Sequence, residues 1–70
     1  MLAERAPNTL RIVREARGLT GRELARRCGV HPSLVSKIEH GAVRPWPAFR
    51  RRAAESLGVD EALLFGQPPR

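Results

Sequence analysis

Small hydroxyl side chains and one cation alternate with apolar residues in the segment PSLVSKIEH, residues 32–40. At about 100° per residue, Leu34, Val35 and Ile38 fall on one arc of a helix, which we expect to face a core. The opposite arc has no carboxylate and carries Pro32, Ser33, Ser36, Lys37 and His40. Hydroxyl, ammonium and imidazole groups hydrogen-bond to phosphates and base edges, so this arc predicts contact with nucleic acid. The alternative is a helix face that is simply solvated.

Other chemistry has little support in the sequence. Cys28 is the only cysteine, with no histidine or acid partner in a catalytic pattern, and we expect it to fill a core. His31 and His40 lie outside any cluster of metal ligands. We therefore expect a protein that is not an enzyme, with no catalytic residue, metal or cofactor.

The charge of the chain agrees with a polyanionic partner. The 70 residues include 13 basic and 7 acidic side chains, for a formal charge of +6. Such an excess favours nucleic acid, although solubility alone is the alternative explanation. No apolar run approaches the roughly 20 residues that span a bilayer, so we expect a cytoplasmic location and no membrane partner.

Helical signals recur along the chain, and no alternating strand pattern occurs. Thr20 and Glu23 form a T-x-x-E capping box, Gly29 is a helix stop, and Pro32 suits a first helical position. Five helices are predicted, over about 8–17, 20–29, 32–40, 47–57 and 61–64.

The ends and faces of the outer helices can also be predicted. Asn8 is the expected N-cap of the first helix, and Asp60 that of the last. Leu10, Val13 and Ala16 recur at helical spacing and should form the inner face of the first helix. We expect one domain over residues 1–70, with a core at about 8–65 and loose tails.

The segment from Leu10 to Leu64 resembles the lambda-repressor/Cro-like (XRE-type) helix-turn-helix family. The matching motifs are LRIVREARGLT, GRELARRCGV, VSKIEHG, and RPWP followed by AAESLGVDEALL. The resemblance implies an all-α, five-helix lambda-repressor-like domain. It also implies that residues 32–40 form a recognition helix that lies in the major groove of duplex DNA.

The resemblance also assigns roles to individual residues. The positions that read bases in this family correspond here to Pro32, Ser33, Ser36 and Lys37. The positions that contact phosphates correspond to Arg14, Gly21, Arg22, His40 and Arg44. An arginine and a glutamate that often pair in this family match Arg14 and Glu39.

Three residues depart from the family pattern. Many relatives have glutamine where Gly21 stands, and the missing side chain leaves backbone amides or Arg22 to bind the phosphate. His31 replaces a serine or threonine cap before the recognition helix and should be a weaker cap. Pro32 replaces a polar reader and offers only an apolar contact, for example to a thymine methyl.

The remaining apolar and basic segments have two interpretations each. Leu63, Leu64 and Phe65 form an apolar end, in which Leu64 and Phe65 are predicted dimer contacts; the alternative is that all three close the core. Trp46 is expected to pack between the third and fourth helices. The arginine run at residues 50–52 is interpreted mostly as a solvated face.

Together these observations predict a sequence-specific duplex DNA-binding transcriptional regulator, expected to repress by occupying a promoter. It would be similar to phage Cro-type repressors or restriction-modification controllers, and would bind a palindromic operator as a homodimer. The alternative is an antitoxin-like module whose main partner is another protein, bound through the apolar C-terminal end.

Overall fold

Five helices make up the computed structural model, which describes residues 8–66. They are α1 (Leu10–Ala16), α2 (Gly21–Cys28), α3 (Pro32–Glu39), α4 (Pro47–Leu57) and α5 (Glu61–Phe65). No strand occurs within residues 8–66, so the predicted all-α, five-helix fold is confirmed. The predicted loose tails, residues 1–7 and 67–70, lie outside the described residues. None of the described helices is long and apolar enough to cross a membrane.

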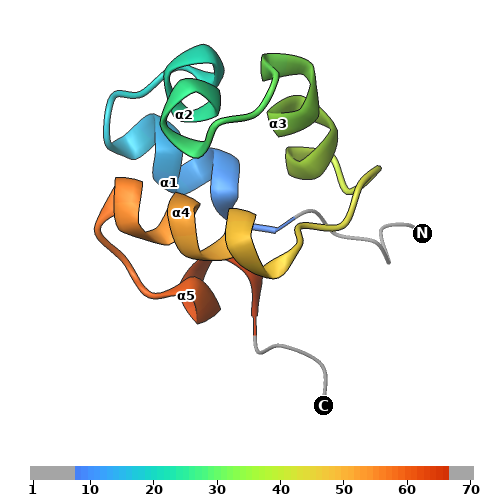
Figure 1. Ribbon diagram of the computed structural model, residues 1–70. Helices are drawn as coiled ribbons and strands as arrows, with labels where there is room; N and C mark the ends of the chain where they lie inside the picture. Colours follow the sequence, from blue (N-terminus) through green and yellow to red (C-terminus); the bar gives the residue numbers. More distant parts are fainter. Residues whose placement is uncertain (1–7, 67–70) are drawn as a thin grey trace, which may run out of the picture.

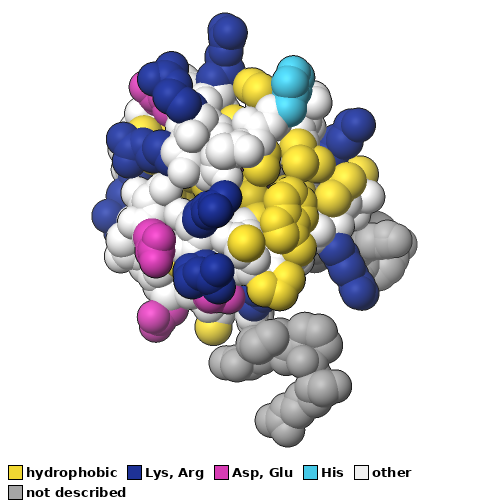
Figure 2. Space-filling model, in the orientation of Figure 1, with side chains coloured by type: hydrophobic (Ala, Val, Ile, Leu, Met, Phe, Trp, Pro, Cys, Tyr) yellow, Lys and Arg dark blue, Asp and Glu magenta, His cyan; other side chains and the backbone are white. Residues whose placement is uncertain are grey.

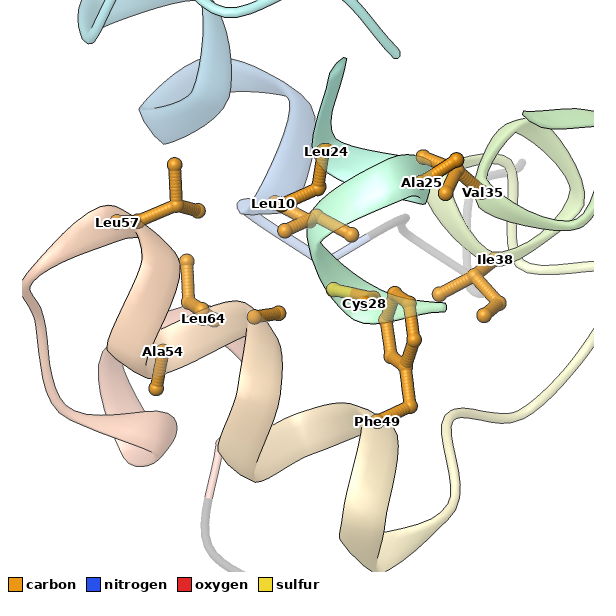
Figure 3. Packing of buried hydrophobic residues seen from close by; sticks show 11 residues of the cluster. Leu10, Leu24, Ala25, Cys28, Val35, Ile38, Phe49, Ala54, Leu57 and Leu64 are labelled. Carbon is orange, nitrogen blue, oxygen red and sulfur yellow. The ribbon is translucent and has the colours of Figure 1, made fainter. Parts of the chain in front are cut away.

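A single apolar core lies where the helices meet (Figure 1). Phe49 extends from α4 towards Cys28 of α2 and Ile38 of α3, and so joins three helices (Figure 3). The other buried apolar residues are Leu10, Leu24, Ala25, Val35, Ala53, Ala54, Leu57 and Leu64. Every helix contributes at least one of them, so the position of α3 depends on the whole domain.

The α2–turn–α3 unit begins and ends as the sequence predicts. The amide of Glu23 donates to the Thr20 hydroxyl over 3.1 Å, and the amide of Thr20 donates to the Glu23 carboxylate over 2.8 Å. Gly29 ends α2 with φ of +74°, a conformation that glycine adopts without steric strain. Pro32 is the first residue of α3. This unit therefore has a defined turn before the predicted recognition helix.

Two outer helices differ in detail from the prediction. α1 begins at Leu10, with Thr9 at the N-cap, although the Asn8 side chain still accepts a hydrogen bond from the Leu10 amide over 3.1 Å. Asp60 occupies the N-cap of α5 but makes no side-chain capping bond. Ala16 is exposed, so its predicted place on the inner face is wrong: in α1 only Leu10 is fully buried.

The arginine run 50–52 is exposed at Arg51 and Arg52, as interpreted, whereas Arg50 is buried. Arg50 is 9% exposed, donates to Glu61 over 3.2 Å and to the Gly66 carbonyl over 2.7 Å, and stacks 5.2 Å from the Phe65 ring. Arg52 donates to the carbonyl of Cys28, at the end of α2, over 3.3 Å. Arg50 therefore links α4 to α5, and Arg52 links α4 to the end of α2. The two side chains reach different elements because residues of a helix point about 100° apart from one position to the next.

Candidate nucleic-acid interface

The inner side of α3 is fixed to the rest of the domain. Val35 and Ile38 are at most 1% exposed in the core. The carbonyl of Ile38 accepts a hydrogen bond from the Asn8 side chain over 3.1 Å, which ties the end of α3 to the start of α1. These contacts leave one side of α3 to face outward.

An ion pair holds the C-terminal end of α3. The Nε of Arg14 donates to Oε2 of Glu39 over 2.6 Å, and Nη2 donates to Oε1 over 3.1 Å. Nη1 of Arg14 donates to the Leu19 carbonyl over 2.8 Å. The hydrogen bond to Glu39 is the main cause of a raised pKa for Arg14. The predicted pairing is confirmed, whereas contact of Arg14 with a phosphate stays a prediction.

The outward side of α3 carries the predicted base-reading residues. Pro32, Ser33, Ser36 and Lys37 are all exposed. On the face that Figure 2 shows, no acidic side chain lies over α3, at the upper right, and the acidic groups lie towards the other helices. Small hydroxyl residues allow close approach, and the absence of carboxylates there avoids repulsion from phosphates.

His31 caps the start of α3 through its side chain, although a weaker cap is predicted there. Its Nδ1 accepts a hydrogen bond from the Ser33 amide over 3.1 Å and lies 2.9 Å from the Ser33 hydroxyl oxygen. The spacing His-x-Ser at a helix start is the sequence signal for this contact. His31 therefore supplies the acceptor that serine or threonine commonly supplies at a helix N-cap.

His40 hydrogen-bonds to the C-terminal end of α3. There its Nδ1 is the donor, whereas Nδ1 of His31 is an acceptor. The Nδ1 of His40 lies 2.8 Å from the Ser36 carbonyl oxygen, which only accepts, so Nδ1 is the donor. A neutral His40 then presents a lone pair at Nε2. Donation from His40 to a phosphate therefore requires the imidazolium form.

The other predicted phosphate contacts lie in two places. Gly21 is the first residue of α2, and a Cβ added there would meet no atom within 4 Å. Arg22 is exposed beside it. The amides of Ala42 and Val43 donate to the Lys37 carbonyl over 2.8 and 3.3 Å, which folds the following loop, with exposed Arg44, against the end of α3.

One apolar residue of α5 contradicts its predicted role, whereas Phe65 as a dimer contact stays a prediction. Leu64 is 1% exposed and belongs to the core, so it is wrongly predicted as a surface contact. Phe65 is partly buried against the core and 6.2 Å from the Phe49 ring, whereas Leu63 is 56% exposed. In a five-residue helix, one of three consecutive apolar residues must face outward because they span more than half of its circumference.

Trp46 and Cys28 belong to the packing of the domain. The Trp46 ring lies 5.4 Å from that of Phe49 and so packs on α4, with 38% of the residue still exposed; its packing against α3 stays a prediction. Cys28 is 1% exposed, and burial raises the pKa of its thiol. The prediction that Cys28 fills the core is confirmed.

A capped helix, a tight glycine turn and an outward-facing second helix define the class of helix-turn-helix domains. The family model described as a helix-turn-helix domain matches residues 8–64. The chain therefore belongs to the helix-turn-helix family, and its structural neighbours identify it as XRE-like, as the resemblance implied. It is a DNA-binding regulator domain. No curated protein matches the chain.

Solved structures of three regulators are similar to the chain. The restriction-modification controller protein C.AhdI from Aeromonas hydrophila is 30% identical, with a TM-score of 0.75 over 80% of this chain and 85% of that one. The clp gene regulator ClgR from Corynebacterium glutamicum is 31% identical, with a TM-score of 0.74 over 77% of this chain and 57% of that one. The hypothetical transcription factor NHTF from Neisseria is 31% identical, with a TM-score of 0.74 over 87% and 69%. The chain thus spans little more than half of the ClgR chain.

Proposed function

We propose that the chain is a sequence-specific regulator that inserts α3 into the major groove and represses transcription by occupying a promoter. The supporting observation is the arrangement of α3: its inner side is buried, and Ser33, Ser36 and Lys37 are exposed together on its outer side. The similarity to a restriction-modification controller protein is consistent with such a role.

Selection of bound duplexes from a random pool, followed by titration, tests this proposal. Replacing Lys37 with alanine should weaken binding to the selected duplex by about 1–3 kcal/mol and broaden the preferred sequence. Replacing Arg44 with alanine should weaken all duplexes alike, because a phosphate contact carries no sequence information. The matched control is Arg11→Ala on α1, where the arginine pairs with Glu15 in an exposed ion pair. If Lys37→Ala binds the selected duplex as tightly as Arg11→Ala does, the proposed insertion of α3 into the major groove is wrong.

We also propose that the chain binds DNA as a homodimer through the surface around Leu63. Leu63 is 56% exposed, and it borders a groove between α5 and the loop before α4. Apolar side chains in the groove lining include Val43, Pro45, Pro47, Ala62 and Phe65. An exposed leucine beside an apolar groove offers the self-complementary contact that a two-fold axis requires.

Replacing Leu63 with glutamate should dissociate the dimer without unfolding the chain, because this side chain is already largely in water. Sedimentation measurements of mass, with circular dichroism to check folding, give the result. A mass that stays at two chains would show that the interface lies elsewhere. The same surface is where an antitoxin-like module would bind its partner protein, and in that case the wild-type chain would be a monomer that selects no duplex.

A further inference from the structure

At the start of α3, one ring nitrogen of His31 contacts both the amide and the hydroxyl of Ser33. The proposed insertion of α3 into the major groove does not depend on these contacts. His31 Nδ1 accepts from the Ser33 amide over 3.1 Å, and the same nitrogen lies 2.9 Å from the Ser33 hydroxyl oxygen. Both residues are exposed, and Ser33 is one of the predicted base-reading residues.

The amide fixes the protonation of the ring. An amide can only donate, so Nδ1 must carry a lone pair, and the proton of the neutral imidazole is on Nε2. Two lone pairs 2.9 Å apart would repel each other. The hydroxyl proton of Ser33 must therefore lie between Oγ and Nδ1, with the hydroxyl as donor to His31.

The consequence concerns what Ser33 can recognise. A serine hydroxyl has one proton and two acceptor lone pairs. With its proton engaged by His31, Ser33 presents only lone pairs towards a base edge. In the major groove, the groups that can donate to them are the exocyclic amino groups, N6 of adenine and N4 of cytosine.

We propose that His31 is a positioning residue that fixes Ser33 as a hydrogen-bond acceptor, so that α3 reads an exocyclic amino group of adenine or cytosine. This inference rests on the proposed function. It limits the base atoms that can bond to the Ser33 hydroxyl. Guanine O6 and N7 and thymine O4 only accept hydrogen bonds, so they are excluded as partners of Ser33.

The first test needs no DNA. Nitrogen-15 spectra of the histidine rings, at a pH where both are neutral, should show Nδ1 of His31 unprotonated and Nε2 protonated. His40 is the internal control, since its Nδ1 donates to the Ser36 carbonyl and should carry the proton. A proton on Nδ1 of His31 would overturn the inference even if the chain binds DNA as proposed.

The second test uses base analogues in the selected duplex. Adenine is replaced by purine, or cytosine by 2-pyrimidinone, one position at a time, to delete single amino groups. At one position the deletion should weaken wild-type binding by about 2- to 12-fold, the effect of one neutral hydrogen bond. The same deletion should leave the affinity of Ser33→Ala unchanged. We call the coupling the part of the loss caused by a base analogue that disappears in Ser33→Ala. Coupling of Ser33 to 7-deazaguanine, to 4-thiothymine or to no base analogue at all would contradict the assignment.

Variants of His31 separate its positioning role from simple capping. In His31→Ala the hydroxyl is released, so the coupling between Ser33 and the amino group should fall while the other base positions keep their preferences. His31→Asn should restore the coupling, because its amide oxygen can accept from both the Ser33 amide and the hydroxyl. Equal coupling in His31→Ala and the wild type would sink the proposal. A wild-type chain that selects no duplex would instead refute the proposed function.

Discussion

The Arg14–Glu39 pair is the most consequential pair of charges in the domain, because it is nearly buried. The Glu39 side chain is 5% exposed and that of Arg14 11%, whereas the Arg11–Glu15 pair is 58% and 56% exposed. A buried charge that loses its partner keeps its desolvation penalty, whereas exposed charges are hydrated by water. The two pairs therefore allow a direct comparison within one protein.

Replacing Glu39 with glutamine should lower the free energy of unfolding by about 3–5 kcal/mol, since it leaves the Arg14 guanidinium without its counter-charge. The matched variant Glu15→Gln should lower it by less than about 1 kcal/mol. Urea unfolding followed by circular dichroism measures both.

A double variant guards against a misleading result from a chain that simply fails to fold. Arg14→Met combined with Glu39→Leu replaces the pair with apolar groups and should be more stable than Glu39→Gln, because no buried charge remains. Similar losses in Glu39→Gln and Glu15→Gln would show that the pair is not buried in solution.

At the scale of elements, the capping box of α2 makes the stability of the α2–turn–α3 unit depend on pH. The pKa of Glu23 is lowered from its ordinary value of 4.5, mainly by the hydrogen bond that its carboxylate accepts from the Thr20 amide. A lowered folded-state pKa means that the stabilisation is complete above the ordinary value and is lost as pH falls through the folded-state value.

Glu23→Gln tests this dependence, because glutamine can still accept from the Thr20 amide but does not titrate. Unfolding free energies of the wild type and the variant should differ by a constant amount near neutral pH. The difference should then move against the wild type as pH falls below about 4.5. Parallel curves down to acid pH would show that the carboxylate is not in the capping box.

Helix positions could be predicted from the sequence because their signals are local. The Thr20–Glu23 box, Gly29 and Pro32 each act within one turn, and the structure has them as predicted. The failures come from contacts between distant residues. The identity of Arg50 says nothing of Glu61 and Gly66, which it reaches across the domain.

The candidate site follows the same rule. The outward arc of α3 was predictable from periodicity alone, since exposure of Ser33, Ser36 and Lys37 follows from burial of Val35 and Ile38. His31 was predicted only as a weaker cap, because histidine is an uncommon cap and propensity ranks it low, yet it makes the capping bond to the Ser33 amide. Leu64 was predicted as a surface contact but is buried, and Leu63 is exposed instead, because a five-residue helix leaves its rotation to tertiary packing.

At the scale of the whole molecule, the net charge of +6 does not act on DNA uniformly, because some cations are paired inside the fold and others are exposed. Arg14 and Arg50 are paired with carboxylates inside the fold. Among the exposed cations of α2, α3 and the loop after it, the predicted DNA contacts are Arg22, Lys37 and Arg44; Arg26 and Arg27 of α2 are exposed as well. Each cation that neutralises a phosphate releases counterions, which gives a slope of about −0.9 in log affinity against log salt.

The salt dependence of binding should therefore report how many chains contact the operator. Three cations predict a slope of about −2.7 for one chain, and two chains on a palindrome predict about −5.4. Titrations of the selected duplex at several salt concentrations measure the slope, and Arg44→Ala should make it less steep by about 0.9 for each bound chain. A full site and a half-site duplex, compared in the same series, separate the two cases. A slope near −2.7 on both duplexes would mean that one chain binds alone, and a slope near zero would mean that these three residues do not face DNA.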